Sequence, residues 1–258
     1  MLRFENVSKK FGEREVLSNV SFTVNKGEIV SIVGPSGTGK SVTLKHIVGL
    51  LKPDSGKIFL GDDEISAATG KDLARIRRRF GYLFQGGALL GWLTLAENIA
   101  LPLREALRLD EDEIDARVEE ALEAVGLSGS ANLYPSEVSG GMQKRAGLAR
   151  AIVRRCDIVL YDEPTSGLDP VTSVTIDNLI KRVNEERRIT SIVVTHDLRQ
   201  ALLCSDRIVM LKDARVQADC TPDEFVSSDI PAVKDFLAAR FITKETYEKL
   251  REDYEKKR

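Results

Sequence analysis

Short apolar runs alternate with glycine, proline and charged residues along most of the chain. Residues 29–33 form one such run, a glycine-rich loop follows it, and residues 41–51 then have the pattern of a helix that Pro53 would stop. Repetition of strand, loop and helix predicts an α/β fold, with a parallel sheet and helices on its faces. The later strand-like runs are residues 158–161, 192–195 and 208–211.

Two stretches depart from this alternation. Residues 2–33 are broken by Gly12 and a later polar triplet into several short strands, which predicts a β-rich lobe ahead of the glycine-rich loop. After Gln85 the pattern is helical: acidic residues crowd a helix start at Asp110, and Gly126 stands where the helix would end. We therefore expect an inserted helical subdomain. The apolar residues on one face of its helix are Ile114, Val118, Leu122 and Val125.

Composition narrows the class of protein. With 258 residues, 42% of them hydrophobic, the chain can bury a core and hold one large domain plus a subdomain. Its formal net charge of −2 provides no basic field that would concentrate nucleic acid or an anionic membrane surface. The global charge is otherwise silent about partners, and we expect no nucleic acid among them. The apolar runs are far shorter than the roughly 20 residues that cross a bilayer, and the first residues lack the apolar core of a secretory signal. Cys156, Cys204 and Cys220 have neither CxxC spacing nor an even count, and we expect reduced, packed thiols.

The glycine-rich loop matches the phosphate-binding pattern G-x-x-x-x-G-K-[ST] directly behind a strand. Its glycines allow backbone N–H groups to turn toward phosphates, and the helix that follows presents the positive end of its dipole. Lys40 is expected to reach the terminal phosphates, and the Ser41 hydroxyl to ligate magnesium. A glycine-rich turn without a ligand is the alternative, and the flanking strand and helix count against it. The expected ATP-binding residues here are Gly34, Pro35, Ser36, Gly37, Thr38, Gly39, Lys40, Ser41 and Thr43.

Two carboxylates, Asp162 and Glu163, end the apolar run 158–161. In an enzyme with such a phosphate loop, the first carboxylate supports the magnesium shell beside Ser41, and the adjacent one can align and polarise the attacking water. We therefore assign Asp162 to the metal and Glu163 to the water. Alone, a strand that ends in acidic residues could be a solvated strand exit, but the phosphate loop upstream favours the catalytic interpretation.

A third motif opens a helix after Val138. Ser139 is a good N-cap, yet Gly140 and Gly141 in the first turn weaken a helix by about 1 kcal/mol each relative to alanine. That cost indicates close approach of a ligand to bare backbone. With this motif in view, the chain resembles the nucleotide-binding subunit of an ATP-binding cassette (ABC) transporter over roughly residues 2–220. The motifs occur in the family's order: the phosphate loop, Ser139-Gly140-Gly141, Asp162-Glu163, Ser166-Gly167-Leu168-Asp169 and His196.

The resemblance implies a fold and a division into domains. The fold is that of a P-loop NTPase, an ABC ATPase core with a β-rich N-terminal lobe and an inserted helical subdomain. Residues 1–85 and 151–220 would form the ATP-binding core, and residues 86–150 the helical subdomain with the signature motif. Residues 221–258 would form a C-terminal helical extension.

The resemblance also implies catalytic roles. Phe11 would stack on adenine, although the family often has tyrosine at that position. Gln85 would contact magnesium and the attacking water, and His196 would bond the γ-phosphate. Together with Lys40 and Glu163, Gln85 and His196 make the expected catalytic set.

The family's working unit is a head-to-tail dimer. In that dimer the signature motif of one subunit closes over the ATP that the other subunit holds, and the loop 166–169 touches the partner across the sites. Met142 replaces the usual signature glutamine and cannot donate its amide hydrogen bonds, although Gln143 follows directly. The expected signature contacts to ATP are Ser139, Gly140, Gly141 and Met142.

Within the family, residues 83–89, 98–105 and 135–142 are similar to the ATPases of lipid-asymmetry systems of the Mla and Mce type. This likeness implies ATP and Mg²⁺ as cofactors and lipid or phospholipid movement between membranes. The implied partners are a transmembrane permease subunit, a second copy of this chain, and accessory cytosolic and substrate-binding subunits. The chain would be peripheral, on the cytoplasmic face of the inner membrane.

Two clusters and one histidine outside the motifs have competing interpretations. The apolar residues around Trp92 could be subdomain core, but in this family the segment helps to form the groove for a short helix of the membrane subunit. His46 is expected to be a packed or surface histidine rather than a ligand. Four arginines near residue 77 are expected on a solvated helix face rather than on anionic lipid. The clusters are Leu89, Leu90, Trp92, Leu93 and Leu95, and Arg75, Arg77, Arg78 and Arg79.

The tail beyond residue 220 has two parts. Pro222 and Pro231 punctuate its start, and an apolar face then predicts docking on folded protein. Tyr247, Leu250 and Tyr254 form a narrow stripe at helical spacing, too small to stabilise a free helix. Because similar lipid-system ATPases grip the neighbouring subunit with such tails, we expect this part to strengthen a homodimer; a frayed end is the alternative. The docking face is Val233, Phe236, Leu237 and Phe241.

Three other functions stay open at this stage. The chain could be the ATPase of an ABC importer or exporter for another substrate. It could be a soluble ABC ATPase that acts on DNA or ribosomes, although only 54 positions separate Gln85 from Ser139, which leaves no room for a long coiled coil. It could also be a regulatory module without hydrolysis, against which Glu163 and His196 count.

Overall fold

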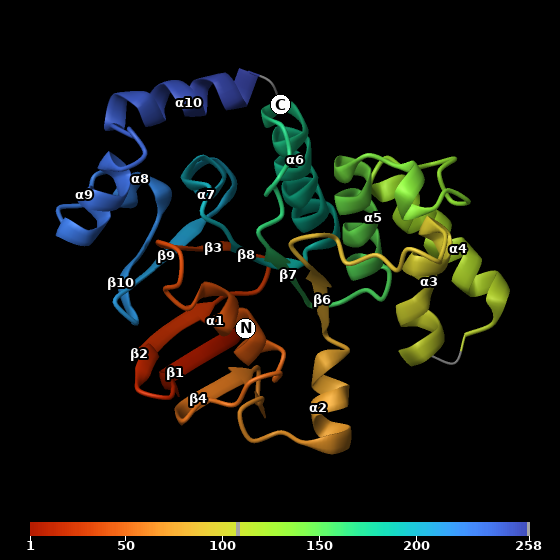
Figure 1. Cartoon of the computed structure of the whole chain (residues 1–258), viewed down its shortest axis with the longest axis horizontal. Helices are drawn as coiled ribbons and strands as arrows, with labels where there is room; N and C mark the ends of the chain where they lie inside the picture. Colours follow the sequence, from red (N-terminus) through yellow and green to blue (C-terminus); the bar gives the residue numbers. More distant parts are fainter. Residues whose placement is uncertain (107–108, 257–258) are drawn as a thin grey trace. The chain divides into compact units, whose positions relative to one another are not determined.

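The computed structural model describes residues 1–106 and 109–256. The chain divides into two compact units: unit 1 comprises Met1–Arg77 and Ile192–Arg258, and unit 2 comprises Arg78–Ser191. Strands and helices alternate along it, as predicted for an α/β fold (Figure 1). In the described part, no helix combines the length and the apolar character needed to cross a bilayer. The functional division into core, helical subdomain and extension stays a prediction.

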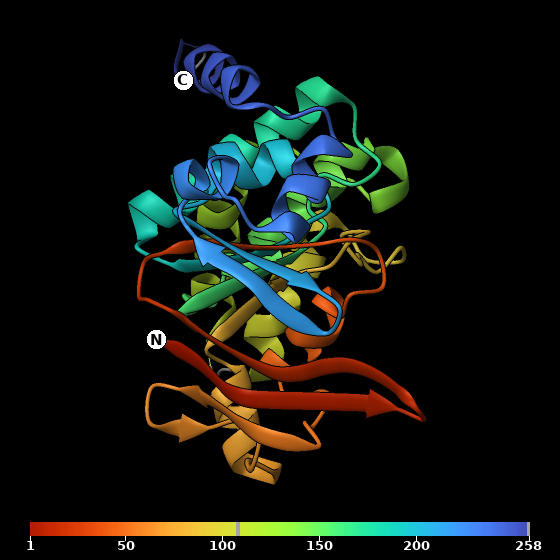
Figure 2. The same ribbon diagram turned by 90° about the vertical axis from the view of Figure 1, so that its left-hand side faces the viewer.

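An antiparallel sheet opens unit 1. Its strands β1 (Leu2–Phe11), β2 (Arg14–Val24), β4 (Ser55–Leu60) and β5 (Asp63–Glu64) lie in the order β2-β1-β4-β5. β1 and β2 form one long hairpin around Gly12, whose φ of 59° suits the turn (Figure 2). The predicted breaks at Gly12 and at residues 25–27 are confirmed, because β1, β2 and β3 are separated there. β1 and β2 are longer than predicted, with 10 and 11 residues, and the register shifts along β1 bend it without ending it.

A second sheet contains the strands that flank the expected motifs. In unit 1 its order is β10 (Arg215–Cys220), β9 (Arg207–Lys212), β3 (Ile29–Val33) and the end of β8 (Thr190–Val194). β3 and β9 are parallel. Every residue of β3 and β8 is buried, which is why they read as continuous runs rather than as alternating ones. The strands predicted at 29–33, 192–195 and 208–211 are confirmed.

Helix α1 (Lys40–Ile47) follows β3 after the glycine-rich loop. The prediction that it would run to residue 51 and stop at Pro53 was wrong by a turn. The helix ends earlier because Gly49 adopts a left-handed conformation, with φ of 65°, and donates its N–H to the His46 carbonyl. Helix α2 (Gly70–Arg77) completes the N-terminal part of unit 1.

The C-terminal part of unit 1 contains α7 (Leu198–Cys204), α8 (Pro222–Val226), α9 (Pro231–Ala238) and α10 (Lys244–Lys256). Proline occupies the first position of α8 and of α9, where its missing N–H has no partner to lose. The two prolines therefore start helices, which agrees with their predicted role as punctuation.

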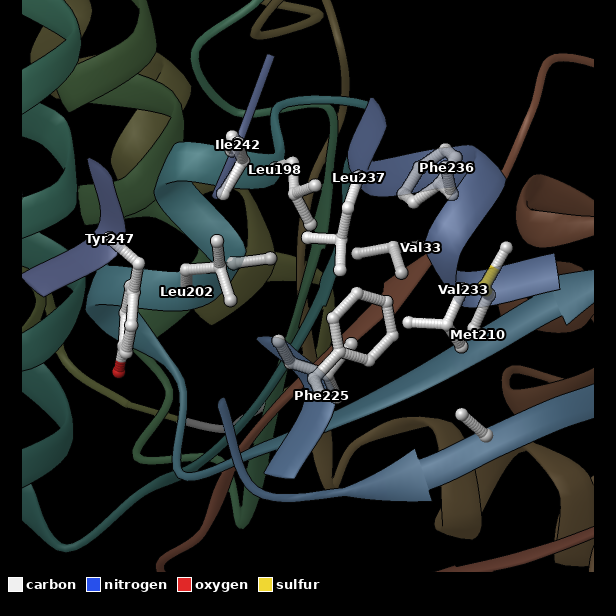
Figure 3. Packing of buried hydrophobic residues seen from close by; sticks show 13 residues of the cluster. Val33, Leu198, Leu202, Met210, Phe225, Val233, Phe236, Leu237, Ile242 and Tyr247 are labelled. Carbon is white, nitrogen blue, oxygen red and sulfur yellow. The ribbon is translucent and has the colours of Figure 1, made fainter. Parts of the chain in front are cut away.

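A buried apolar cluster joins α8, α9 and the start of α10 to α7, β3 and β9 (Figure 3). Burial of Val233, Phe236 and Leu237 confirms that the first tail helix docks on folded protein. Phe241, predicted on the same face, is instead 87% exposed, because α9 has ended and the chain reverses there with φ of 55°. Tyr247 is buried in the cluster, so this residue of the predicted stripe packs on its own chain.

Unit 2 combines a parallel strand pair with five helical segments among its described residues. The pair is β6 (Phe80–Leu83) and β7 (Ile158–Asp162), and the strand predicted at 158–161 is thereby confirmed. The helical segments are α3 (Leu95–Ala106), α4 (Glu111–Ala124), the short 3₁₀ helix η1 (Pro135–Glu137), α5 (Gly140–Ile152) and α6 (Pro170–Arg187).

Helix α4 follows its sequence pattern closely. The Asp110 carboxylate caps it by accepting from the Glu113 N–H at 2.8 Å, and Gly126 has φ of 66° just past its end. The last turn lacks a basic residue of its own, and Arg145 of α5 donates to the Gly126 carbonyl instead. The predicted apolar face is buried: Ile114, Val118, Leu122 and Val125.

Candidate functional site

The phosphate loop, residues 34–41, runs in unit 1 from the end of β3 into the first two residues of α1. At Gly34 φ is 150°, and a Cβ atom there would lie 2.1 Å from the Leu211 carbonyl oxygen of β9. At Gly39 φ is 96°, and a Cβ would lie 2.9 Å from the Val16 carbonyl oxygen of β2. The loop thus threads between two strands at a distance that only glycine permits.

Lys40 is held inside the loop. Its Nζ donates to the carbonyl oxygens of Gly34 at 2.9 Å and Pro35 at 3.0 Å, and the residue is buried. The outer part of the loop is exposed, as is Ser41 at the start of α1. A buried ammonium beneath an exposed, glycine-rich backbone is an arrangement that can receive phosphate groups.

Two further side chains support the loop. The Thr43 hydroxyl donates to the Gly39 carbonyl at 3.1 Å and the residue is fully buried, so it braces the loop, while its expected contact with ATP stays a prediction. Arg14 of β2 donates to the Gly37 carbonyl at 3.1 Å. Sequence reasoning missed Arg14, because no motif marks it and only the pairing of β2 brings it to the loop.

Unit 1 also carries the expected adenine-stacking and γ-phosphate residues. Phe11 ends β1 and is 48% exposed, and the Lys9 ammonium lies 5.7 Å from its ring centroid. His196 directly follows the Thr195 that ends the predicted strand, and its side chain is exposed. The guanidinium of Arg240 donates to the His196 carbonyl at 3.3 Å. Both residues are exposed, and their expected contacts with the nucleotide stay predictions.

In unit 2, Asp162 is the last residue of β7, and its Oδ2 accepts from the Tyr82 hydroxyl of β6 at 3.3 Å. Burial and, secondly, the Asp162 charge raise the pKa of Tyr82 well above its usual value, so this hydroxyl remains a donor at neutral pH. The Asp162 carboxylate is thus oriented by a neutral hydrogen-bond donor. Sequence reasoning missed Tyr82.

Glu163 has a left-handed backbone, with φ of 50°. Its carbonyl accepts from the Ser166 N–H and from the Nζ of Lys144, each at 3.2 Å. Lys144 lies on α5 and is only 5% exposed. Burial lowers the pKa of Lys144, while the charges of Glu163 and Asp162 oppose that change. Lys144 falls on the buried face of α5, and a lysine at such a position is a sequence signal that could have pointed to its contact with Glu163.

The signature motif begins α5. Ser139 caps the helix as predicted, its Oγ accepting from the Met142 N–H at 3.3 Å, and Ser139 and Gly140 are exposed. Gly141 is buried, and a Cβ there would lie 2.5 Å from the Cγ2 of Thr172 on α6. Packing against α6 therefore favours glycine at this position, and the expected contact of Gly140 and Gly141 with ATP stays a prediction.

Gln143 follows Met142, and its side-chain amide is already hydrogen-bonded within the chain: Nε2 donates to the Pro135 carbonyl at 2.8 Å.

The loop after Glu163 ends in Asp169, which caps α6 by accepting from the N–H groups of Val171 and Thr172 at 3.0 Å. Hydrogen bonds from Thr172 and then from Val171 lower the pKa of Asp169. Asp169 is therefore ionised and fixed at neutral pH.

The remaining clusters divide between surface and core. Gln85 is exposed and Trp92 is 75% exposed, whereas Leu95 is buried at the start of α3. His46 is packed, as predicted: Nδ1 lies 2.7 Å from the Val42 carbonyl oxygen, and burial is the main cause that lowers its pKa. Arg75, Arg77 and Arg78 are exposed, which fits both a solvated face and contact with an anionic partner, so the solvated interpretation stays a prediction.

Comparison with known proteins identifies the family. The family model described as ABC transporter matches residues 17–166, more than half of the chain. The chain belongs to the ABC transporter family. It is therefore an ABC ATPase that binds and hydrolyses ATP, as the sequence resemblance implied.

Relatives of this ABC ATPase match it over most of its length. MlaF of Haemophilus influenzae, an intermembrane phospholipid transport system ATP-binding protein, is 41% identical over 92% of this chain and 90% of its own length. The probable ribonucleotide transport ATP-binding protein mkl of Mycobacterium tuberculosis is 42% identical over 93% of this chain and 67% of its own. A dimeric ATP-binding cassette solved in a post-hydrolysis state with ADP and Pi has a TM-score of 0.78 and 38% identity, and the match covers 86% of this chain and 99% of that chain.

Proposed function

We propose that this ABC ATPase powers the movement of phospholipid or a related lipid between membranes through a transmembrane permease. The observation that carries the proposal is the 41% identity over 92% of the chain to MlaF, which is named for intermembrane phospholipid transport. The likeness of residues 83–89, 98–105 and 135–142 to ATPases of the Mla and Mce type supports the same assignment.

The proposed chemistry is phosphoryl transfer to water. Catalysis of this reaction depends on positioning of the reactants and on charge neutralisation rather than on covalent chemistry by the protein. Lys40 would neutralise the terminal phosphates, and its bonds to the loop carbonyls limit the side-chain entropy lost on binding. Glu163 would orient the attacking water together with Gln85, and His196 would bond the γ-phosphate. Phe11, with its half-exposed ring, would stack on adenine.

Magnesium is the proposed metal. The Ser41 hydroxyl, the Asp162 carboxylate and the Gln85 amide carbonyl are oxygen donors, the ligand type that Mg²⁺ prefers. The Tyr82 hydroxyl, which donates to Asp162 at 3.3 Å, is the kind of supporting hydrogen bond that orients a metal ligand. When bound, the ion would neutralise charge on the β- and γ-phosphates.

The proposed working unit is a head-to-tail homodimer bound to the permease, peripheral on the cytoplasmic face of the inner membrane. The exposed Ser139 and Gly140 lie at the start of α5, where the helix dipole favours an anion such as the γ-phosphate held by the other subunit. Similarity to a dimeric cassette supports this arrangement. Met142 would complete the signature contact, and accessory cytosolic and substrate-binding subunits would complete the system.

A second substrate class has a specific observation in its favour. The relative mkl, at 42% identity, is named for probable ribonucleotide transport. The alternative is therefore an ABC transporter ATPase for a nucleotide or another small polar molecule. The permease and its substrate-binding partners select the cargo, so side chains of the ATPase do not distinguish the two.

The test uses the membrane protein that copurifies with the full-length chain in detergent. The complex is reconstituted in proteoliposomes, and ATP-dependent transfer of a fluorescent phospholipid to acceptor vesicles is measured beside uptake of a radiolabelled ribonucleotide. We expect phospholipid transfer that requires ATP and is lost in the Glu163→Gln complex. Ribonucleotide uptake without lipid transfer would replace the lipid proposal with the alternative.

A further inference from the structure

The C-terminal extension, residues 221–256, lies outside the segment that the family model matches. Its helices share a buried cluster with Leu198 and Leu202 of α7 and with Val33 of β3 (Figure 3). Helix α7 begins two residues after His196, and Val33 directly precedes the phosphate loop. The extension therefore packs against two elements of unit 1 that carry proposed ATP-binding groups.

One residue of the extension contacts His196 directly. The Nε of Arg240 donates to the His196 carbonyl oxygen at 3.3 Å. Its guanidinium lies over the ring of Phe236, 4.0 Å from the centroid, and Phe236 is itself buried in the cluster. Stacking on a fixed ring orients the planar guanidinium, so the direction of the hydrogen bond is set by the packing of α9.

The backbone on either side of His196 is anchored to the scaffold. The Thr195 N–H donates to the Ile32 carbonyl of β3 at 3.2 Å, and the Asp197 N–H donates to the Thr195 hydroxyl at 3.0 Å. The Asp197 carboxylate caps α7. These bonds hold the residues before and after His196, and the Arg240 bond holds the His196 carbonyl itself.

Arg240 is fixed by the chain reversal that follows α9. Its N–H and that of Ile242 both donate to the Leu237 carbonyl, at 3.0 and 3.1 Å, and Leu237 and Ile242 are buried in the cluster. Between them Phe241 takes a φ of 55°, a conformation that bulky residues rarely adopt. The reversal therefore holds Arg240 between two buried anchors.

We propose that Arg240 is a positioning residue for His196, through which the C-terminal extension sets the place from which the imidazole bonds the γ-phosphate. The inference rests on the proposed role of His196. If Arg240 positions His196, the affinity for ATP depends on the C-terminal extension. The affinity for ADP, which has no γ-phosphate, does not depend on it.

The experiment measures equilibrium dissociation constants for ATP and ADP in the full-length chain with Glu163→Gln, where slow turnover permits ATP titration. Arg240→Gln removes the guanidinium. The matched control is Arg251→Gln, because Arg251 is also an extension arginine but pairs with Asp223 and Glu255. His196→Ala serves as the reference for loss of the γ-phosphate contact.

We expect Arg240→Gln to weaken ATP binding about 3- to 10-fold, the range that the net contribution of one typical intramolecular hydrogen bond gives, and to leave ADP binding unchanged. Arg251→Gln should change neither constant. Equal weakening of ATP and ADP, or no change in either, while His196→Ala affects ATP alone, would overturn the inference and leave the role of His196 intact. If His196→Ala leaves the ratio of the ATP and ADP dissociation constants unchanged, the proposed role of His196 is overturned, and the inference with it.

Discussion

At Gly34 the phosphate loop passes so close to β9 that the residue type is dictated by backbone geometry. A Cβ atom would lie 2.1 Å from the Leu211 carbonyl oxygen, and that oxygen belongs to a strand of the sheet and cannot swing aside as a side chain would. Any side chain at Gly34 would therefore push the phosphate loop away from β9.

We predict that Gly34→Ala destabilises the chain by roughly 1–3 kcal/mol, the usual cost of overpacking, and abolishes measurable ATP binding because the loop must move. Gly61→Ala is the matched control, since Gly61 also has a positive φ, 62°, but has open space around its Cβ position. Urea unfolding and titration with a fluorescent ATP analogue are the measurements. Wild-type ATP affinity in Gly34→Ala would show that the loop geometry is not needed.

Several side chains around the expected site could not be read from the sequence, for physical reasons. Arg14, Tyr82 and Lys144 act on backbone or carboxylate groups that are distant in sequence, so only the pairing of strands and the packing of α5 bring them into place. The motif residues were predictable because each sits in a fixed local pattern of loop and element. Long-range contacts have no such pattern.

At the scale of elements, a helix or strand could be predicted from the sequence where local residues mark its ends and its buried face. Strand β3 and helix α4 were predictable because an unbroken apolar run and a capped amphipathic pattern each fix an element locally. The end of α1 was not, because Gly49 and Pro53 are both stop signals and the nearer one acted. The breaks around β1 and β2 were predictable because glycine and polar residues mark them, whereas the lengths of the two strands were not.

The segment between β6 and α3 carries the proposed contact with the permease. Trp92 is 75% exposed while Leu95, the first residue of α3, is buried, so the segment presents an exposed aromatic side chain three residues before a buried anchor. We predict that Trp92→Glu leaves ATP binding by the isolated chain intact and abolishes copurification with the permease. Leu50→Glu, at another exposed apolar residue, should copurify normally. A melting temperature lowered by several degrees in Trp92→Glu would instead favour the core interpretation.

Helix α10 is tied to its own chain through Tyr247, which is 5% exposed in the cluster with α7. We predict that Tyr247→Ala lowers the free energy of unfolding by about 2–4 kcal/mol, as for truncation of a buried aromatic residue. Phe241→Ala removes an equally large but exposed ring and should change it by less than about 0.5 kcal/mol. Urea unfolding compares the two variants, and equal effects would mean that α10 does not dock as described.

For the whole molecule, unit 1 carries the phosphate loop, Phe11, His196 and the extension, and unit 2 carries Gln85, the signature motif and both carboxylates. Family membership makes the chain an ATPase, and similarity to a dimeric cassette supports a dimer that closes on ATP. The expectation that residues 243–258 strengthen this dimer stays a prediction. Burial of Tyr247 shows that one residue of the predicted stripe is already used within the chain.

The central claim is that Glu163 orients the water that attacks ATP, and steady-state hydrolysis by purified Glu163→Gln tests it most directly. Glutamine keeps the size of the side chain but loses the carboxylate charge, so binding should persist while kcat falls by at least about 100-fold, the usual range for removal of a group that acts on the attacking nucleophile. Lys40→Ala, measured in parallel, should weaken ATP binding itself. The account predicts that Glu163→Gln binds ATP with near wild-type affinity and barely hydrolyses it. Near-normal hydrolysis by this variant, with contaminating ATPase excluded by the inactivity of Lys40→Ala prepared in the same way, would contradict it.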